Sequence, residues 1–427
     1  MIRNGKRKIA LTAVAGASLL TMALTGCQSG TDNGGGESAE TGELTVWLVG
    51  SDTPDSAREY LKKTFEAENE GWTLQIEEKT WADTNEAYVA ALSSSDSPDV
   101  VEVGNTQSQG FIEQGLFEDI TDQVADLGGD DLLQSFVDLG SADGATYAVP
   151  YYAGSRIVFY SEQVTGAEQP QTLEEYVAKG KSLKTDTRSG IWAPGKDWYN
   201  ALAFVWANGG EIAVKDGDDW DAQFSSDESV KGLEMLQDVY LNANVAPADS
   251  NEQDPQVPFC AGETGYLSAP SWVKWSILAP TDAENPGCPD TFGSDLHAFP
   301  LPGIKAGEAA PVFAGGSNVA IAAKSDAKDK AAEALKILLS EGYQKELAAN
   351  GLIPALKSFA EFLPDDEITA AAATATASSK SVPASPKWSE VESSLVIPDA
   401  LVKIAQGGDV TQIATDLDKE IESILNG

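Results

Sequence analysis

Apart from its acids, this sequence of 427 residues holds few side chains that could perform catalysis. His297 is the single histidine, and no Gly-x-Ser-x-Gly pentapeptide is present that would expose a nucleophilic serine on a sharp turn. A glycine-rich phosphate loop ending in Lys-Ser or Lys-Thr is also absent. The 67 Asp and Glu residues still allow a catalytic pair of carboxylates, although no spacing singles one out.

The acids Asp216, Asp218, Asp219 and Asp221 form a run that could suggest a calcium site. An EF-hand calcium loop requires an oxygen ligand at its fifth position and glycine at its sixth. Trp220 occupies the fifth position of this run, so the template fails. No His and Cys residues have the spacing of a zinc site either. We therefore predict no metal and no cofactor.

The first residues determine the expected compartment. The apolar stretch 9–24 ends in Leu24-Thr25-Gly26-Cys27 and follows four basic residues, Arg3, Lys6, Arg7 and Lys8. This pattern is typical of a signal peptide (residues 1–26) with a lipobox. The stretch is shorter than the roughly 20 residues of a transmembrane helix, although an uncleaved anchor remains the alternative. We expect Cys27 to be lipidated and to hold the protein on the extracellular face of the cell membrane.

Residues 27–42 hold glycine, serine and threonine but no large apolar side chain, which predicts a flexible tether. The remaining body is long enough for two domains. Its net charge is strongly negative, since the whole chain carries −39. Such a charge repels nucleic acid and anionic lipid surfaces and keeps an extracellular protein soluble. We therefore expect a monomer without a nucleic-acid partner that contacts the membrane through its lipid anchor only.

Beyond Cys27, only Cys260 and Cys288 are present, an even pair in a protein expected outside the cell. An oxidising compartment favours a disulfide between them. Two buried free thiols are the alternative.

The order of expected elements is typical of an α/β protein. Residues 44–49, 74–76, 99–103 and 156–160 are short, rich in β-forming residues, and predict strands. Residues 56–69, 172–182, 329–350, 368–379 and 410–425 have helical spacing, and Thr172 can cap its helix. Turns at residues 208–211 and 216–218 flank an expected hairpin. A strand, a helix and a further strand in succession predict a parallel sheet with crossover helices.

Four segments in order carry a resemblance to a known family. They are Pro98–Asn105 with the following Phe111–Phe117, then Asp143–Tyr152, then Phe259–Leu267 running to Trp272, and finally Phe313–Asn318 with Gly351–Pro354 beyond. Together, behind a lipobox, they resemble the carbohydrate-binding extracellular solute-binding proteins of ABC importers, the family related to maltose-binding protein. The resemblance covers essentially the whole mature chain.

This resemblance implies a two-lobed, periplasmic-binding-protein-like (type II) α/β fold, with a ligand cleft between lobes joined by a hinge. The expected first lobe comprises residues 43–150 and 310–355, and the second comprises residues 151–309 and 356–427. It also implies a protein that captures an oligosaccharide and delivers it to the transmembrane subunits of an ABC permease. Aromatic rings would stack on the apolar face of the sugar, and buried polar groups would pair with its hydroxyls.

The resemblance and the local chemistry nominate the ligand-binding residues. Trp272 is similar to the family's tryptophan at the binding wall, and Trp275 lies one helical turn beyond. The stretch after the expected lobe crossing supplies Tyr151, Tyr152, Ser155 and Arg156. The guanidinium of Arg156 suits a pair of hydroxyls or a carboxylate, and a structural ion pair is its alternative role.

Further candidates come from other parts of the chain. Asp197 and Trp198 stand at the start of an apolar helix, where Asp197 could also be a helix cap. The glycine-rich stretch Gly315, Gly316 and Ser317 brings backbone amides close to a ligand. The remaining candidates are Trp81, Asn105 and Gln107 from the first lobe and Trp388 from the last segment.

Two other functions remain open at this level. An extracellular glycoside hydrolase would use two carboxylates that flank a sugar. A binding protein for a peptide, a polyamine or a metal chelate is the second alternative. The aromatic candidates favour a sugar over an ion, and we therefore expect a sugar receptor that is not an enzyme.

Overall fold

The computed structural model describes residues 41–50, 53–81, 86–217, 219–283 and 286–427. The expected signal peptide, Cys27 and nearly all of the expected tether lie outside the described residues. Within the described part, none of the helices combines the length and the hydropathy needed to cross a bilayer.

A parallel strand–helix–strand unit opens the described chain. β1 (Gly42–Val49) pairs in parallel with β2 (Trp72–Lys79) and with β3 (Val100–Gly104). α1 (Asp55–Glu68) connects β1 to β2 and buries Ala57, Leu61 and Phe65, which recur every four residues on one face. The expected crossover helix and parallel sheet are thereby confirmed.

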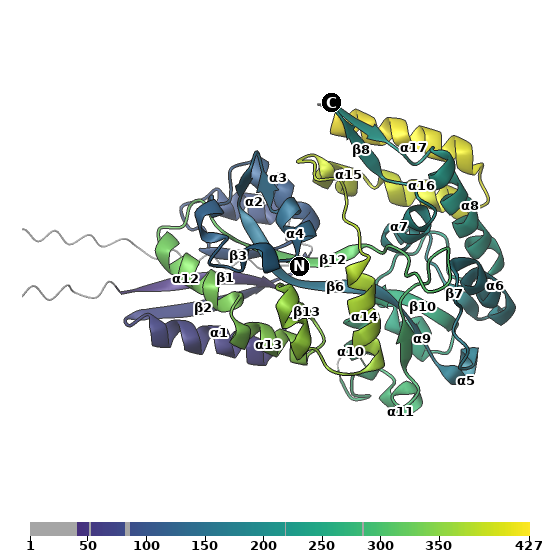
Figure 1. The fold of residues 1–427 in the computed structure, drawn as a ribbon, viewed down its shortest axis with the longest axis horizontal. Coiled ribbons are helices and arrows are strands. Elements are labelled where there is room, and N and C mark those ends of the chain that lie inside the picture. The colour runs from purple at the N-terminus through teal and green to yellow at the C-terminus, as the bar shows by residue number, and fades with distance from the viewer. Residues whose placement is uncertain (1–40, 51–52, 82–85, 218, 284–285) are drawn as a thin grey trace, which may run out of the picture. The chain divides into compact units, whose positions relative to one another are not determined.

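Two long strands continue this sheet and connect it to the rest of the protein. β12 (Ala314–Ile321) pairs antiparallel with β3 on one side and with β6 (Ala148–Tyr160) on the other. The first half of β6 pairs with β12 and β13 (Ile353–Pro354), and its second half pairs with β10 (Thr264–Pro270) and β11 (His297–Phe299). β7 (Ser189–Trp192) completes the second half in parallel with β10. Figure 1 shows β6 and β12 side by side.

The buried apolar residues form separate clusters. We call the part around the two smaller clusters, with β1, β2, β3, α1, α12 and α13, the first lobe. Val100 belongs to one of these clusters and Val101 to the other, because successive side chains of a strand point to opposite faces of the sheet. We call the part around the largest cluster, with α6, α7, α8, β7 and β10, the second lobe. Tyr152 packs in the first lobe, whereas Ala153 and Ala314 pack in the second.

The remaining helices and strands complete the two lobes. In the first lobe they are α2 (Glu86–Leu92), α3 (Ser108–Glu113), β4 (Ser141–Ala142), β5 (Ala145–Thr146), α12 (Lys328–Leu338) and α13 (Glu341–Ala349). α4 (Gln134–Leu139) contacts β4 and β6, and its buried Phe136 and Leu139 belong to the largest cluster. In the second lobe they are α5 (Glu162–Thr165), α6 (Leu173–Leu183), α7 (Trp198–Ala207), β8 (Ala213–Asp216), β9 (Asp219–Ala222), α8 (Asp227–Asn242), α9 (Gln256–Cys260), α10 (Val273–Leu278), α11 (Pro289–Phe292), α14 (Glu367–Ala377), α15 (Trp388–Ser394), α16 (Val396–Ala405) and α17 (Val410–Leu425).

Most predicted elements are confirmed, and one is wrong. Thr172 accepts a hydrogen bond from the backbone N–H of Glu175, as expected of a cap. β8 and β9 form a hairpin in the expected region, with the turn predicted after Asp216 between its strands and not beside them. The single helix predicted over residues 329–350 is instead two helices, α12 and α13. The Ser340 side chain accepts a hydrogen bond from the backbone N–H of Tyr343, so Ser340 caps a new helix. The spacing of the apolar residues alone had suggested that the first helix continued through this position.

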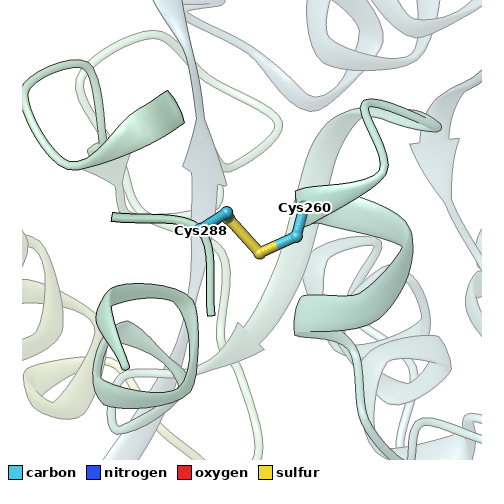
Figure 2. The surroundings of a disulfide bond; sticks show 2 residues. All are labelled: Cys260 and Cys288. Atoms are coloured by element: carbon cyan, nitrogen blue, oxygen red, sulfur yellow. A yellow bond between two sulfur atoms is a disulfide. The ribbon is translucent and has the colours of Figure 1, made fainter. Parts of the chain in front are cut away.

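The two cysteines of the second lobe are joined by a disulfide (Figure 2). Cys260 is the last residue of α9, and Cys288 directly precedes α11. Their Cα atoms lie 5.5 Å apart across a sequence separation of 28 residues. The disulfide therefore ties two short helices of the second lobe together, as the even cysteine count favoured.

Candidate ligand-binding cavity

A cavity of about 550 Å³ is lined by side chains from both lobes. We call its first-lobe side the first wall, which comprises Trp81, Gly104, Asn105, Thr106, Gln107 and Tyr152. We call its second-lobe side the second wall, which comprises Arg156, Tyr199, Glu252, Gln253, Pro255, Pro270, Trp272, Val273, Phe313 and Glu392. The crossing strands β6 and β12 contribute Gly154, Gly315, Gly316 and Ser317 between the walls.

Alternation along β6 decides which of its predicted residues reach the cavity. Tyr152, Gly154 and Arg156 line it, at every second position. Tyr151 and Ser155 do not. The Tyr151 hydroxyl is hydrogen-bonded to that of Tyr343 in the first-lobe core, and Ser155 Oγ shares a 2.8 Å hydrogen bond with Thr376 Oγ1.

Trp272 lies against the backbone of β6. It directly precedes α10, and a Cβ added at Gly154 would come within 2.2 Å of its ring. Only glycine leaves room for the indole at this point. The absence of a side chain at Gly154 therefore lets Trp272 take its place in the cavity wall.

Two predicted tryptophans support the wall without lining the cavity. Trp198 and Trp388 are 7% and 0% exposed, and their ring centroids lie 6.1 Å apart. Tyr199 and Phe313 line the cavity at this part of the wall, and their ring centroids lie 4.8 Å apart. Sequence reasoning missed both of these residues. Tyr199 adjoins the nominated Trp198 on α7, where one step along the helix turns a side chain by about 100°.

Trp275 and Asp197 also lie outside this cavity. The Trp275 side chain is 37% exposed and lines a smaller, separate cavity with Asn350 and Gly351. Asp197 is buried and caps α7, since its carboxylate accepts from the backbone N–H of Asn200 at 3.1 Å. The alternative role of Asp197 as a helix cap is thus the one that the structure shows.

The first wall is held by hydrogen bonds within the protein. Gln107 Oε1 accepts from the backbone N–H of Gly104 at 3.1 Å, and Asn105 Nδ2 donates to the carbonyl of Ala314 at 2.8 Å. The Tyr152 hydroxyl donates to Glu102 Oε1 at 3.0 Å, and Ser317 Oγ donates to that hydroxyl at 3.3 Å. These bonds fix the polar side chains in place before any ligand arrives.

The second wall carries the charged groups. Arg156 is 7% exposed, and its guanidinium lies 4.8 Å from the centroid of the Tyr199 ring. Within the described residues it makes no hydrogen bond and no ion pair, and its buried Nε has no partner. Burial raises the pKa of Asp197 and of Glu252, while the nearby charge of Arg156 acts in the opposite direction on both.

Glu392 is the second carboxylate of this wall, and sequence reasoning missed it together with Glu252. Its Oε1 accepts from Trp388 Nε1 at 3.0 Å, and its Oε2 accepts from Thr106 Oγ1 at 3.4 Å. Burial raises the pKa of Glu392 to about 7, although both hydrogen bonds favour the ionised form. The bond to Thr106 joins the second wall to the first.

A small cluster away from the cavity holds metal-ligand residue types. Glu162, Asp295 and His297 each place one potential ligand atom within 4.8 Å of the others. Two of the three side chains have partners within the protein, because Asp295 accepts from the backbone N–H of Glu162 at 3.2 Å and His297 Nδ1 is hydrogen-bonded to Glu367 at 2.8 Å. The cluster is explained by these contacts within the second lobe.

Residues 60–376 match the bacterial extracellular solute-binding protein family, and the chain belongs to that family. The diacetylchitobiose-binding protein DasA of Streptomyces coelicolor is 32% identical over 400 residues, which cover 91% of each chain. The predicted resemblance to solute-binding proteins of ABC importers is therefore confirmed.

Solved structures of two receptors share the fold. The GacH receptor of Streptomyces glaucescens superposes with a TM-score of 0.77 at 19% identity, over 91% of this chain and 99% of that chain. The sugar-binding protein MalE from Xanthomonas citri also gives a TM-score of 0.77 at 19% identity, over 90% and 98%. The predicted two-lobed α/β fold is confirmed by these likenesses.

Proposed function

We propose that the chain is the substrate-binding protein of an ABC sugar importer, which captures an oligosaccharide outside the cell and delivers it to a membrane permease. The observation that carries this proposal is a cavity with aromatic and polar groups on both walls. Its volume of about 550 Å³ falls within the usual range of ligand sites, about 300–1,000 Å³. Aromatic rings stack on the apolar faces of sugars, and fixed polar groups pair with sugar hydroxyls.

Within this cavity, Trp272 is proposed as the central stacking surface. Tyr199 and Phe313 would extend the aromatic area on the same wall, and Trp81 would contribute a ring from the first wall. Asn105, Gln107, Tyr152, Arg156 and Ser317 would supply polar contacts, and Gly315 and Gly316 would allow the ligand to approach the backbone. Since the walls belong to different lobes that are joined through β6 and β12, closure of the lobes would remove water from both.

The same proposal includes the cellular setting. Removal of residues 1–26 and acylation of Cys27 would anchor a monomeric receptor on the extracellular face of the membrane, beside its permease. Mass spectrometry of the amino-terminal peptide is expected to find diacylglyceryl-modified Cys27. In a Cys27→Ala variant the protein is expected to leave the membrane fraction. An unmodified Cys27 in the native host would contradict the anchor and leave the sugar-binding proposal standing.

The function is tested by titrating the purified chain with oligosaccharides in a calorimeter. Diacetylchitobiose is the first probe because the relative DasA is a diacetylchitobiose-binding protein, and a panel of malto-, cello- and xylo-oligosaccharides follows. We expect one sugar to bind with a stoichiometry of one and to remain intact. Glu252 and Glu392 both line the cavity, and paired carboxylates are what a glycosidase uses. The sugar is therefore also assayed for hydrolysis, and turnover would contradict the receptor function.

A further inference from the structure

The charges around the cavity are unevenly distributed. Among the lining residues, Arg156 is the one basic side chain in the described structure, whereas Glu252 and Glu392 are both acidic. Asp197 adds a third carboxylate close behind the second wall, because it lines a small pocket together with Arg156 and Glu252. Acids thus outnumber bases at the second wall.

Arg156 offers hydrogen-bond donors to the cavity without adding an excess of positive charge. The residue is 7% exposed and makes no hydrogen bond within the described chain, so its donors are available to acceptors of a bound ligand. The carboxylates of Asp197 and Glu252 both interact electrostatically with it. An acceptor without charge, such as a hydroxyl or an amide carbonyl, suits donors whose charge is already compensated.

Glu392 has no such compensation. Its two hydrogen-bond donors, Trp388 Nε1 and Thr106 Oγ1, are both neutral. Within the described chain no lysine, arginine or histidine forms an ion pair with it. A carboxylate offers about four acceptor positions, so capacity remains for donors on a ligand. A ligand carboxylate near it would meet a like charge, and this repulsion is screened less at a half-buried group than in bulk water.

We propose that this cavity selects uncharged sugar units over acidic ones, and that Glu392 is the residue that sets this selectivity. Arg156 then donates to a neutral acceptor of the bound sugar, and Glu392 accepts from its hydroxyl or amide donors. This inference rests on the proposed function, since it specifies the class of sugar that the same cavity takes.

The test uses matched probes that differ in one charge. They are diacetylchitobiose, two derivatives in which the C6 hydroxymethyl of either unit is oxidised to a carboxylate, and the methyl esters of both derivatives. Calorimetry is performed at pH 8.5, where Glu392 is ionised because its pKa is about 7. We expect at least one ester to bind and the matching acid to bind at least tenfold more weakly.

Glu392→Gln should lower this ester-to-acid ratio at least threefold. The matched control is Glu390→Gln, which removes one charge from an exposed position of the same helix, α15, and should keep the ratio of the unaltered protein. Equal affinities for acid and ester would overturn the inference, and so would a ratio that falls equally in both variants. If neither ester bound, the acidic derivatives would be excluded by their shape and not by their charge. This result would also overturn the inference. Failure of diacetylchitobiose and of the whole oligosaccharide panel to bind would overturn the proposed function together with the inference.

Discussion

The two walls of the cavity are built in different ways. The first wall follows β2 and β3, and its polar side chains are bonded to the protein itself, as for Gln107 and Asn105. The second wall combines residues from strands, loops and helices and holds Arg156 of β6, Glu252 and Glu392 of α15. Its charged groups have few partners, and burial raises the pKa of both glutamates. If the proposed charge selectivity holds, the first wall provides a fixed shape, while the second wall discriminates between ligands by charge.

Removing the disulfide is expected to have the largest effect among these tests. This bond supports the second wall and not the first. Residues 252–255 lie outside any helix or strand and lead directly into α9, which ends at the disulfide-bonded Cys260. Replacing both Cys260 and Cys288 by serine is expected to lower the free energy of unfolding by about 2–4 kcal/mol. Urea unfolding of the two proteins measures this, and reduction of the unaltered protein serves as the control. An unchanged unfolding midpoint would show that the second wall is stable without the bond.

Glu392 should make the stability of the protein depend on pH. Its pKa is raised from 4.5 to about 7 in the folded state. Between these values the folded chain retains a proton that the unfolded chain has released, so this group makes stability fall as the pH rises. Above pH 7 the full cost is up to about 3 kcal/mol. Glu392→Gln removes this cost.

The unfolding temperature of Glu392→Gln relative to the unaltered protein is therefore expected to increase from pH 4.5 to pH 8. Scanning calorimetry at several pH values measures this difference, and Glu390→Gln controls for the loss of one charge from α15. A difference that is constant over this range would mean that the Glu392 carboxyl is better solvated than the structure indicates.

Stacking on the second wall should contribute more to affinity than stacking on the first. Trp272→Ala is expected to cost more than about 2 kcal/mol, or roughly 30-fold in affinity for the bound sugar. Trp81→Ala should cost less, because this side chain is 42% exposed at the first wall. Trp275→Ala is the matched control from the neighbouring turn of α10, outside the cavity. Unchanged affinity in Trp272→Ala would refute its role as the central stacking surface.

Local patterns in the sequence predicted much of the fold. Apolar strands such as residues 44–49 and the capped helix at Thr172 follow from nearest-neighbour chemistry. The prediction of a single helix over residues 329–350 was wrong because Ser340 caps a new helix there, although the spacing of the apolar residues continues without a break. Capping depends on one side chain, and periodicity averages over many.

The cavity was predictable only in part. Trp272, Tyr152 and Arg156 were nominated from their segments and line it. Glu252 and Glu392 were missed because they come from segments far apart in sequence, and only tertiary packing brings them to one wall. By contrast, alternation along a strand already implies that Tyr151 and Tyr152 do not both face the cavity, although only the structure shows that Tyr152 is the one that does.

The smallest effect is expected when the two adjacent tyrosines, Tyr151 and Tyr152, are each replaced by phenylalanine. Tyr152→Phe removes the hydroxyl that donates to Glu102 and accepts from Ser317 beside the cavity. Its loss is expected to weaken sugar binding by about 1 kcal/mol, or roughly fivefold. Tyr151→Phe removes the bond to Tyr343 inside the first-lobe core, so it should lower the unfolding temperature and leave affinity unchanged. Calorimetric titration and thermal unfolding of both variants measure the two effects. If Tyr151→Phe weakened binding as much as Tyr152→Phe did, alternation along β6 would not determine which residues serve the first wall.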